Sequence, residues 1–447
     1  MAAQDQKYIQ MTQTPVEKLI VQLAVPSIIS MLVTTIYNAA DTFFIGQIST
    51  AASAAVGVCF SMMSIIQALG FFFGQGAGAS ISRALGNQNG EDAQELASLG
   101  FFSAIGLGLG VTGLGLLFIK PLVLFLGATE TIYPHAVEYL SIILVGAPIM
   151  AASFVLNNLL RFQGYSLYGM VGVTVGGVLN VILDPVFIFL LDLGTAGAAL
   201  ATVVSQTVGL VVLYVMNNRF SSVKIRVRNF RIRGRHYENI IRGGLPSLLR
   251  QSIASVATIC LNLAAKPYGD AAIAAMSITG KITMFTNSAM LGFGQGFQPV
   301  CGFNYGAGLY DRVKKGFVFC VNGSFVFLSV LAVAEFFCAD ALVGVFRDDP
   351  QVIAIGATAL KLQCLTLPCL SIIIISNMML QTSGRVVPAS LVGMARQGIF
   401  LIPMLFILPQ LLGLMGLQMS QPCADFCTAV MTIPLTLRFL RELDSKA

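Results

Sequence analysis

Twelve long apolar runs, separated by short polar breaks, constrain the fold of this chain of 447 residues more than any other feature. They cover residues 18–47, 51–80, 95–126, 132–162, 166–191, 195–217, 240–265, 270–300, 315–346, 351–382, 387–411 and 413–437. A helix needs about 20 apolar residues to cross a bilayer, and every run reaches that length. The chain is only 10% charged, whereas a soluble domain carries about 25%. We therefore expect an all-α polytopic membrane protein with twelve transmembrane helices.

Basic residues are distributed unevenly between the loops. Most of the 26 Lys and Arg residues lie near the chain ends or in loops after even-numbered runs, whereas Lys120, Lys266 and Arg347 follow odd-numbered runs. The positive-inside rule then predicts that both termini are cytoplasmic. Anionic lipid headgroups suffice to explain the net charge of +6, so no nucleic-acid partner is expected. The polar first 18 residues lack the profile of a cleaved signal peptide, so the first run is predicted to span the membrane.

The two halves of the chain resemble each other at a nearly constant offset. The segment "AASAAVGV" at 51–58 matches "AAIAAMSI" at 271–278, "GQG" at 74–76 recurs at 294–296, and Asn157 matches Asn377. We call the shift that carries position 51 to position 271 the repeat offset. Each half holds six runs, an even number, so both enter the membrane in the same direction.

The repeat predicts two six-helix bundles, residues 1–217 and 240–447, related by a pseudo-twofold axis along the membrane normal. Residues 218–239 form a basic connection between them. A transporter of this plan has its substrate site between or within the halves.

Two aspartates break this symmetry. Asp41 and Asp184 lie inside apolar runs, and their counterparts in the second half are Leu261 and a position at or next to Met404. An aspartate at the centre of a span costs about 2.5–3.5 kcal/mol on insertion scales, so such residues face a cavity or the bundle interior. The first half is therefore predicted to have an acidic interior that the second half lacks. The alternative is an aspartate that caps a broken helix or reaches the membrane interface.

Helical spacing groups the polar residues of the first half. Three pairs are four residues apart and so share a helix face: Tyr37 with Asp41, Asn180 with Asp184, and Thr202 with Gln206. If these faces converge, they form a pocket with two carboxylates, an amide and a hydroxyl. Two carboxylates in a low-dielectric pocket cannot both stay ionised without a cation. The pocket is therefore predicted to hold a proton or a hard cation such as Na⁺.

Further residues are assigned to the cavity and to hinges. The predicted substrate cavity contains Tyr37, Asn38, Asn157, Asn158 and Gln206, although hydrogen bonding between helices explains Asn157 and Asn158 equally well. Pro26 and Pro185 interrupt apolar runs, and each removes one backbone donor. They are the predicted hinges.

Several stretches resemble the multidrug and toxic compound extrusion (MATE) transporters. They are "AVPSIISMLVTTIYNAADTFFIG", "GAGASISRALGNQNGEDA", "GGVLNVILDPVFIF" and "GTAGAALATVVSQ", and the likeness extends from about residue 15 to residue 440. The resemblance implies that Asp41 is a cation or proton site, and that Asn180, Asp184 and Thr202 belong to it. A second type of site in this family uses acidic residues of the second half. Arg250 occupies the run where that type carries a glutamate, which favours coupling in the first half.

The resemblance implies a monomeric antiporter in the bacterial cytoplasmic membrane. It would export organic cations and other amphiphilic drugs in exchange for H⁺ or Na⁺, and it would be neither an enzyme nor a cofactor-binding protein. Its partners are then small-molecule drugs and membrane lipid. No resident metal is expected, apart from Na⁺ at Asp41, Asn180, Asp184 and Thr202 if that is the coupling ion.

Three alternatives make different demands on the sequence. A lipid-linked oligosaccharide flippase of the same superfamily needs a cavity lined with cationic residues, whereas the predicted cavity is mostly acidic or neutral. A membrane prenyltransferase needs DxxxD clusters that bind Mg²⁺, and none occurs. A gated channel would carry single-channel currents. No Walker motif occurs either, so an ion gradient is the expected source of energy.

The charged residues of the second half have two interpretations. Asp425 is either a second titratable site or the partner of a basic residue, Arg396 or Lys281. For Lys281 and Arg250 the same choice is open, and structural pairing is the preferred interpretation.

Overall fold

The first half of the chain folds into helices. In the computed structural model, which describes residues 3–446, these are α1 (Ala3–Gln13), α2 (Val16–Gly46), α3 (Thr50–Gly86), α4 (Gly90–Leu117), α5 (Ile119–Phe125), α6 (Tyr133–Phe162), α7 (Ser166–Pro185), the π-helical segment η1 (Val186–Leu190) and α8 (Gly194–Phe220).

The second half is also helical. Its elements are η2 (Val227–Asn229), α9 (Gly234–Ala265), η3 (Lys266–Tyr268), α10 (Asp270–Gly306), α11 (Tyr310–Phe346), α12 (Pro350–Thr366), η4 (Leu367–Cys369), α13 (Leu370–Thr382), α14 (Val386–Met394), the π-helical segment η5 (Ala395–Phe400), α15 (Leu401–Leu412) and α16 (Leu414–Asp444). No strand occurs among the described residues.

The predicted class, an all-α polytopic membrane protein, is confirmed. Eleven helices of the described chain are long and apolar enough to cross a membrane. The remaining predicted span is α10, which is 37 residues long and packs along α2, α3, α11 and α12. Lys281, Asn287 and Gln295 interrupt its apolar sequence. Large apolar side chains such as Phe125, at 88% exposed, lie on the surface, as lipid contact requires.

Some predicted runs are interrupted. The run 95–126 divides into α4 and α5, and the run 351–382 divides into α12 and α13 with the short helix η4 between them. Pro368 lies in η4 and lacks a backbone donor, which accounts for the break there. The run 387–411 contains a π-helical segment, η5, between α14 and α15.

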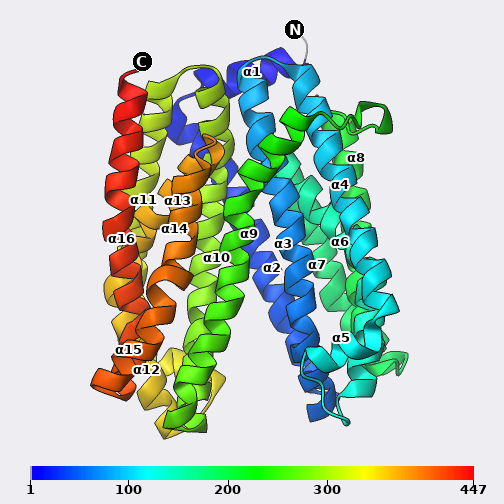
Figure 1. Ribbon diagram of the computed structural model, residues 1–447, viewed down its shortest axis with the longest axis vertical. Coiled ribbons are helices and arrows are strands. Elements are labelled where there is room, and N and C mark those ends of the chain that lie inside the picture. The colour runs from blue at the N-terminus through cyan, green and yellow to red at the C-terminus, as the bar shows by residue number, and fades with distance from the viewer. Residues whose placement is uncertain (1–2, 447) are drawn as a thin grey trace.

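The helices of the two halves lie on opposite sides of the molecule (Figure 1). They are close together at the end that carries α1 and the C-terminal end of α16, and they diverge toward the other end. The most extensive contacts between the halves are made by α2 with α10 and by α3 with α9. Each half thus places its first two long helices against the corresponding helices of the other half.

Glycines allow the close approach of these helices. A Cβ at Gly76 of α3 would lie 2.1 Å from the carbonyl oxygen of Ile240 in α9. A Cβ at Gly296 of α10 would lie 2.4 Å from Cα of Ala24 in α2. Gly76 and Gly296 are related by the repeat offset, and small residues at both crossings let the backbones touch.

A pair of hydrogen bonds follows the same repeat. Nδ2 of Asn157 donates to the carbonyl of Gly169 at 3.1 Å, and Nδ2 of Asn377 donates to the carbonyl of Ala389 at 2.6 Å. The repeat offset relates both the two donors and the two acceptors. The repeat found in the sequence therefore extends to individual side-chain contacts.

The basic connection is tied to α4 by ion pairs. Arg231 and Arg233 each approach the Glu95 carboxylate at 3.3 Å, and Nε2 of His236 lies 3.3 Å from Asp92. Asp92, Glu95 and His236 have ligand atoms within 4.8 Å of one another, the spacing of a metal site. Because two arginines already neutralise Glu95, we interpret this cluster as an ionic link between the connection and α4. The basic connection therefore has partners within the protein, on α4.

Candidate functional site

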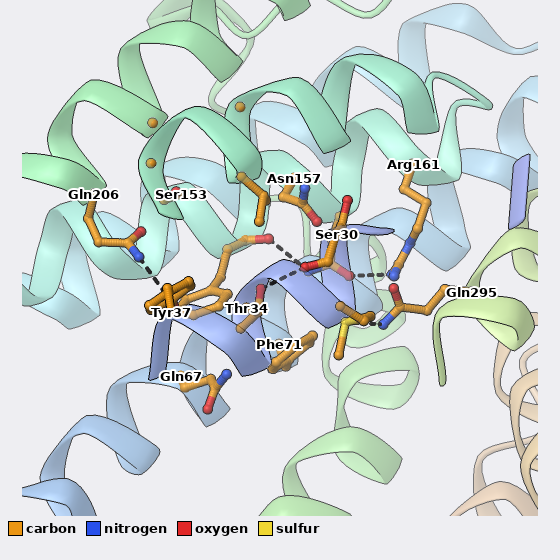
Figure 2. A pocket seen from close by; sticks show the side chains of 17 residues that line it. Ser30, Thr34, Tyr37, Gln67, Phe71, Ser153, Asn157, Arg161, Gln206 and Gln295 are labelled. Carbon is orange, nitrogen blue, oxygen red and sulfur yellow. Dashed lines mark hydrogen bonds between the residues drawn. The ribbon is translucent and has the colours of Figure 1, made fainter. Parts of the chain in front are cut away.

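A polar pocket lies in the first half of the chain. Helices α2, α3, α6, α7 and α8 surround it, Gln295 of α10 reaches it, and its empty volume, open solvent included, is ≈ 660 Å³ (Figure 2). Polar side chains contribute much of its lining: Ser30, Thr34, Tyr37, Gln67, Ser153, Asn157, Asn158, Arg161 and Gln206.

Four of the five predicted cavity residues line this pocket. They are Tyr37, Asn157, Asn158 and Gln206, and Nε2 of Gln206 donates to the Tyr37 hydroxyl at 3.5 Å. Asn38 is not among the residues that line it, and its assignment to the substrate cavity remains a prediction. Successive residues of an α-helix are about 100° apart, and the residue after Tyr37 therefore points away from the pocket.

One face of α2 supplies both the pocket and a carboxylate. Ser30, Thr34 and Tyr37 line the pocket, and Asp41 follows one turn later on the same face. Helix α7 approaches this face closely at Gly177, where a Cβ would lie 2.9 Å from Cγ1 of Val33 and 3.1 Å from Cδ1 of Tyr37. A larger side chain at Gly177 would displace the tyrosine, so the glycine keeps the polar faces of α2 and α7 together.

The structure brings three predicted coupling residues into contact. Nδ2 of Asn180 donates to Oδ1 of Asp184 at 3.2 Å and to Oγ1 of Thr202 at 3.5 Å. Asp184 is 0% exposed, and Asn180 and Thr202 are buried. The second carboxylate oxygen of Asp184 and the amide oxygen of Asn180 have no partner. No basic side chain among the described residues pairs with Asp184. Buried acceptors are normally satisfied, so these two unpaired oxygens are the unusual feature of the contact.

Asp41 belongs to the same neighbourhood. Its Oδ1 is buried and has no hydrogen-bond partner. Its charge acts on the carboxyl of Asp184 and on the hydroxyls of Tyr37 and Tyr139. The two acids therefore share one electrostatic environment, although no hydrogen bond joins their described side chains.

Tyr139 of α6 was not identified from the sequence. It is fully buried, its hydroxyl lies 3.4 Å from Sδ of Met63, and both Asp41 and Asp184 act on it. A tyrosine within an apolar run is indistinguishable from an ordinary core residue. Its position near Asp41 and Asp184 becomes clear only from the packing of α6.

The predicted hinges lie at two different kinds of position. Pro26 is buried inside α2, four residues before Ser30 of the pocket. Pro185 is the last residue of α7, and the π-helical segment η1 begins directly after it. Single π turns are often found at functional sites, and this one begins two residues after Asp184.

The second half is not free of buried carboxylates, contrary to the sequence-based expectation. Glu335 of α11 is 8% exposed, and Thr286 donates to it at 2.7 Å. Glu335 does not lie at a position that the repeat offset relates to Asp41 or to Asp184. The acidic interior is therefore not exclusive to the first half.

Four further charged side chains of the second half differ in their contacts. Arg396 pairs with Asp425 at 2.7 Å, as the salt-bridge interpretation predicted, and Gln421 donates to the same carboxylate at 2.8 Å. Arg250 donates to the side chain of Asn377 at 3.1 Å. Lys281 is exposed and forms no hydrogen bond or ion pair with the described residues.

A two-fold repeat of membrane-spanning helices with an internal polar pocket defines a membrane transporter. A sequence model of the MatE family matches residues 26–186 and matches again at 246–407. The two matches begin at positions related by the repeat offset, and together they cover most of the chain. The chain therefore belongs to the MatE family of transporters.

Relatives of known name extend over nearly the whole chain. The chain is 28% identical over 443 residues to the multidrug export protein MepA of Staphylococcus aureus (strain MRSA252), covering 98% of this chain and 97% of that protein. It is 26% identical over 431 residues to MepA of Staphylococcus haemolyticus (strain JCSC1435), covering 96% and 95%.

Solved structures agree with this assignment. An outward-facing multidrug resistance MATE family transporter of the MOP superfamily superposes with a TM-score of 0.93 at 25% identity, covering 98% of both chains. A MATE protein in a straight conformation gives 0.93 at 26% identity, covering 98% of this chain and 99% of that one. A MOP superfamily transporter from Pyrococcus furiosus, whose binding pocket is described as having reversed polarity, gives 0.92 at 26% identity, covering 98% of both.

Proposed function

We propose that this protein is a secondary active multidrug efflux antiporter. It exports organic cations and other amphiphilic drugs in exchange for H⁺ or Na⁺, and Asp41, Asn180, Asp184 and Thr202 form its coupling site. One observation carries the proposal. Asp184 is fully buried without a basic partner, and it and Asn180 each keep an unsatisfied oxygen. The names of the staphylococcal relatives support multidrug export as the activity.

The arrangement of the halves supports alternating access. We assign residues 1–217 and 240–447 to two lobes and residues 218–239 to their connection. Both termini are assigned to the cytoplasmic side, where the lobes are in contact, and the lobes diverge at the opposite end (Figure 1). The structural likeness to an outward-facing MATE transporter supports assigning this state to the chain.

Coupling requires the ion to bind the two states with different affinity. The pocket and Asp41 lie on one face of α2, and Pro26 precedes both on that helix. Binding of a proton or Na⁺ at Asp41 and Asp184 then competes with the drug or changes the course of α2 at Pro26, so that the pocket no longer holds the drug. The drug leaves toward the outside, and the ion leaves toward the cytoplasm.

Transport in proteoliposomes tests the proposal. Ethidium efflux is measured with a pH gradient and a Na⁺ gradient imposed separately, for the native chain and for Asp41→Asn. One gradient alone is expected to drive efflux by the native protein, and Asp41→Asn is expected to lose it while reaching the membrane in normal amounts. Efflux by Asp41→Asn at the native rate would exclude the assigned role.

Thr202→Val identifies the ion. Valine has nearly the shape of threonine but lacks the oxygen that a Na⁺ ion would bind, and a proton on Asp184 does not need that oxygen. A Na⁺-coupled protein should lose its response to Na⁺ in Thr202→Val. A proton-coupled one should keep its response to pH.

A further inference from the structure

The pocket contains an arginine that no carboxylate neutralises. Arg161 of α6 is 4% exposed, yet it lines the pocket, at the end opposite Gln206 and Tyr37 (Figure 2). Its guanidinium donates to the side-chain oxygen of Asn158, and its Nε has no partner. A cation of this burial is normally paired with an anion.

The groups around Arg161 are neutral or positive. Oδ1 of Asn158 also accepts from Gln75 at 3.2 Å, and Gln75 in turn accepts from Gln298 at 3.1 Å. These amides satisfy hydrogen bonds but do not balance a charge. Arg250 of α9 adds a second guanidinium whose charge acts on Arg161. No acidic side chain of residues 3–446 forms an ion pair with either arginine.

The repeat argues against a purely structural role for these charges. At the repeat offset, Arg161 corresponds to Gln381 and Arg250 corresponds to Ser30. Gln381 is buried and satisfied, because its amide donates to Gly243 and to Ser247, each at 2.8 Å. The same fold therefore accepts a neutral side chain at the equivalent place.

The geometry points to an anion subsite: Arg161 binds the carboxylate or phosphate of an amphiphilic substrate. The planar fork of arginine matches both groups in two parallel hydrogen bonds. The inference rests on the proposed function and adds to its expected substrates molecules that carry an anionic group at one end and a cationic group at the other. The cationic end of such a substrate lies toward Tyr37 and Asp41. Ser30 lines the same pocket as Arg161, and it lies eleven residues before Asp41 on α2, a distance of about 16 Å along the helix.

A matched pair of ligands isolates the anionic group. A zwitterionic fluoroquinolone carries a carboxylate and an amine, and its ethyl ester keeps only the amine. The chain has no tryptophan, so quinolone fluorescence can report binding to the purified protein in detergent. The native protein is expected to bind the acid more tightly than the ester. Arg161→Gln should weaken binding of the acid by about tenfold to hundredfold and leave binding of the ester unchanged.

Two variants serve as controls. Arg161→Lys keeps the charge and should retain much of the preference for the acid. Arg242→Gln removes an exposed arginine that pairs with Glu238 outside the pocket, and it should change neither affinity. Equal weakening of acid and ester in Arg161→Gln would assign the arginine a structural role and overturn the inference, and so would unchanged binding of both.

A second arm identifies the source of the anion. A short prenyl phosphate and the corresponding alcohol are used as competitors of the quinolone. Displacement by the phosphate alone, lost in Arg161→Gln, supports the subsite and assigns it to a lipid phosphate. If the native protein does not transport the quinolone ester under either gradient, the proposed function fails. If the native protein transports the ester but binds the quinolone acid and its ester with equal affinity, only the anion subsite is excluded.

Discussion

Asn180 and Asp184 form a hydrogen bond that leaves each side chain with one unsatisfied oxygen. Nδ2 of Asn180 donates to Oδ1 of Asp184 at 3.2 Å, while Oδ2 of Asp184 and Oδ1 of Asn180 are buried without partners. The four-residue spacing on α7 fixes this geometry, and Pro185 ends the helix directly after it. A proton or a cation beside Thr202 would complete the bonding of the two free oxygens.

Asp184→Asn should abolish gradient-driven efflux. Asparagine has nearly the same shape as aspartate, but its amide neither titrates nor carries a negative charge. The coupling ion can then no longer bind the two conformations of the transporter with different affinity. Efflux is measured in everted vesicles, and protein amount is checked by immunoblot. Drug binding to purified Asp184→Asn should persist, because Asp184 does not line the pocket. Native efflux in this variant would remove Asp184 from the coupling site.

Asp425 is expected to affect stability rather than coupling. Its side chain is 5% exposed and that of Arg396 is 18% exposed, so removing one partner leaves a mostly buried charge. Breaking a buried pair costs about 3–5 kcal/mol, and solvent near Arg396 should reduce this value. Arg396→Gln should therefore lower the melting temperature in detergent, and Arg396→Gln/Asp425→Asn should restore part of it. Loss of ion dependence in a stable Asp425→Asn protein would contradict this interpretation.

Glu335 is a buried carboxyl group that, unlike Asp425, has no basic partner among the described residues. Thr286 donates to one oxygen at 2.7 Å, and Cys364 lies 3.9 Å from the other. No basic side chain of the described residues pairs with it, and burying an unpaired carboxylate is costly, so the neutral acid is the expected form. Glu335→Gln should then keep both the melting temperature and drug efflux close to native values. Glu335→Ala, which leaves the Thr286 hydroxyl without its acceptor, should destabilise the protein by about 1–3 kcal/mol. Loss of efflux in Glu335→Gln would indicate a second coupling site.

The sequence predicted those features that depend on periodicity. Apolar runs predicted the helices, and the constant offset between the halves predicted the repeat. Four-residue spacing placed Asn180 and Asp184 on one helix face, and the family resemblance added Thr202 to them. The sequence could not identify residues whose role depends on the packing of one helix against another. Tyr139 has the character of an apolar core residue until α6 is packed beside the acids.

Helix geometry decides the position of two further side chains. Tyr37 lines the pocket and Asn38 does not, because one residue on a helix turns the side chain by about 100°. Arg161 lies at the end of an apolar run. In an α-helix the side chain points back toward the N-terminus, which directs this arginine from the end of α6 into the pocket.

We expect the docking of α1 to depend on pH because of a partly buried lysine outside the membrane spans. Nζ of Lys7 donates to the carbonyl of Gly164 at 2.7 Å and lies 4.5 Å from the ring centroid of Tyr165. Burial lowers the pKa of Lys7 from 10.5 to about 8. Between these two values the undocked state binds more protons than the docked state, so docking of α1 should become tighter as the pH rises from 8 to 10.5.

A nitroxide at the exposed position 6, in a background without the native cysteines, measures this docking. Its mobility should fall over that range of pH in the otherwise native chain. Lys7→Met carries no titrating group and should give a docked α1 at every pH. Lys7→Arg remains charged throughout, so its α1 should be more mobile and equally insensitive to pH. A pH response that survives in Lys7→Met would assign the effect to another group, because methionine does not titrate.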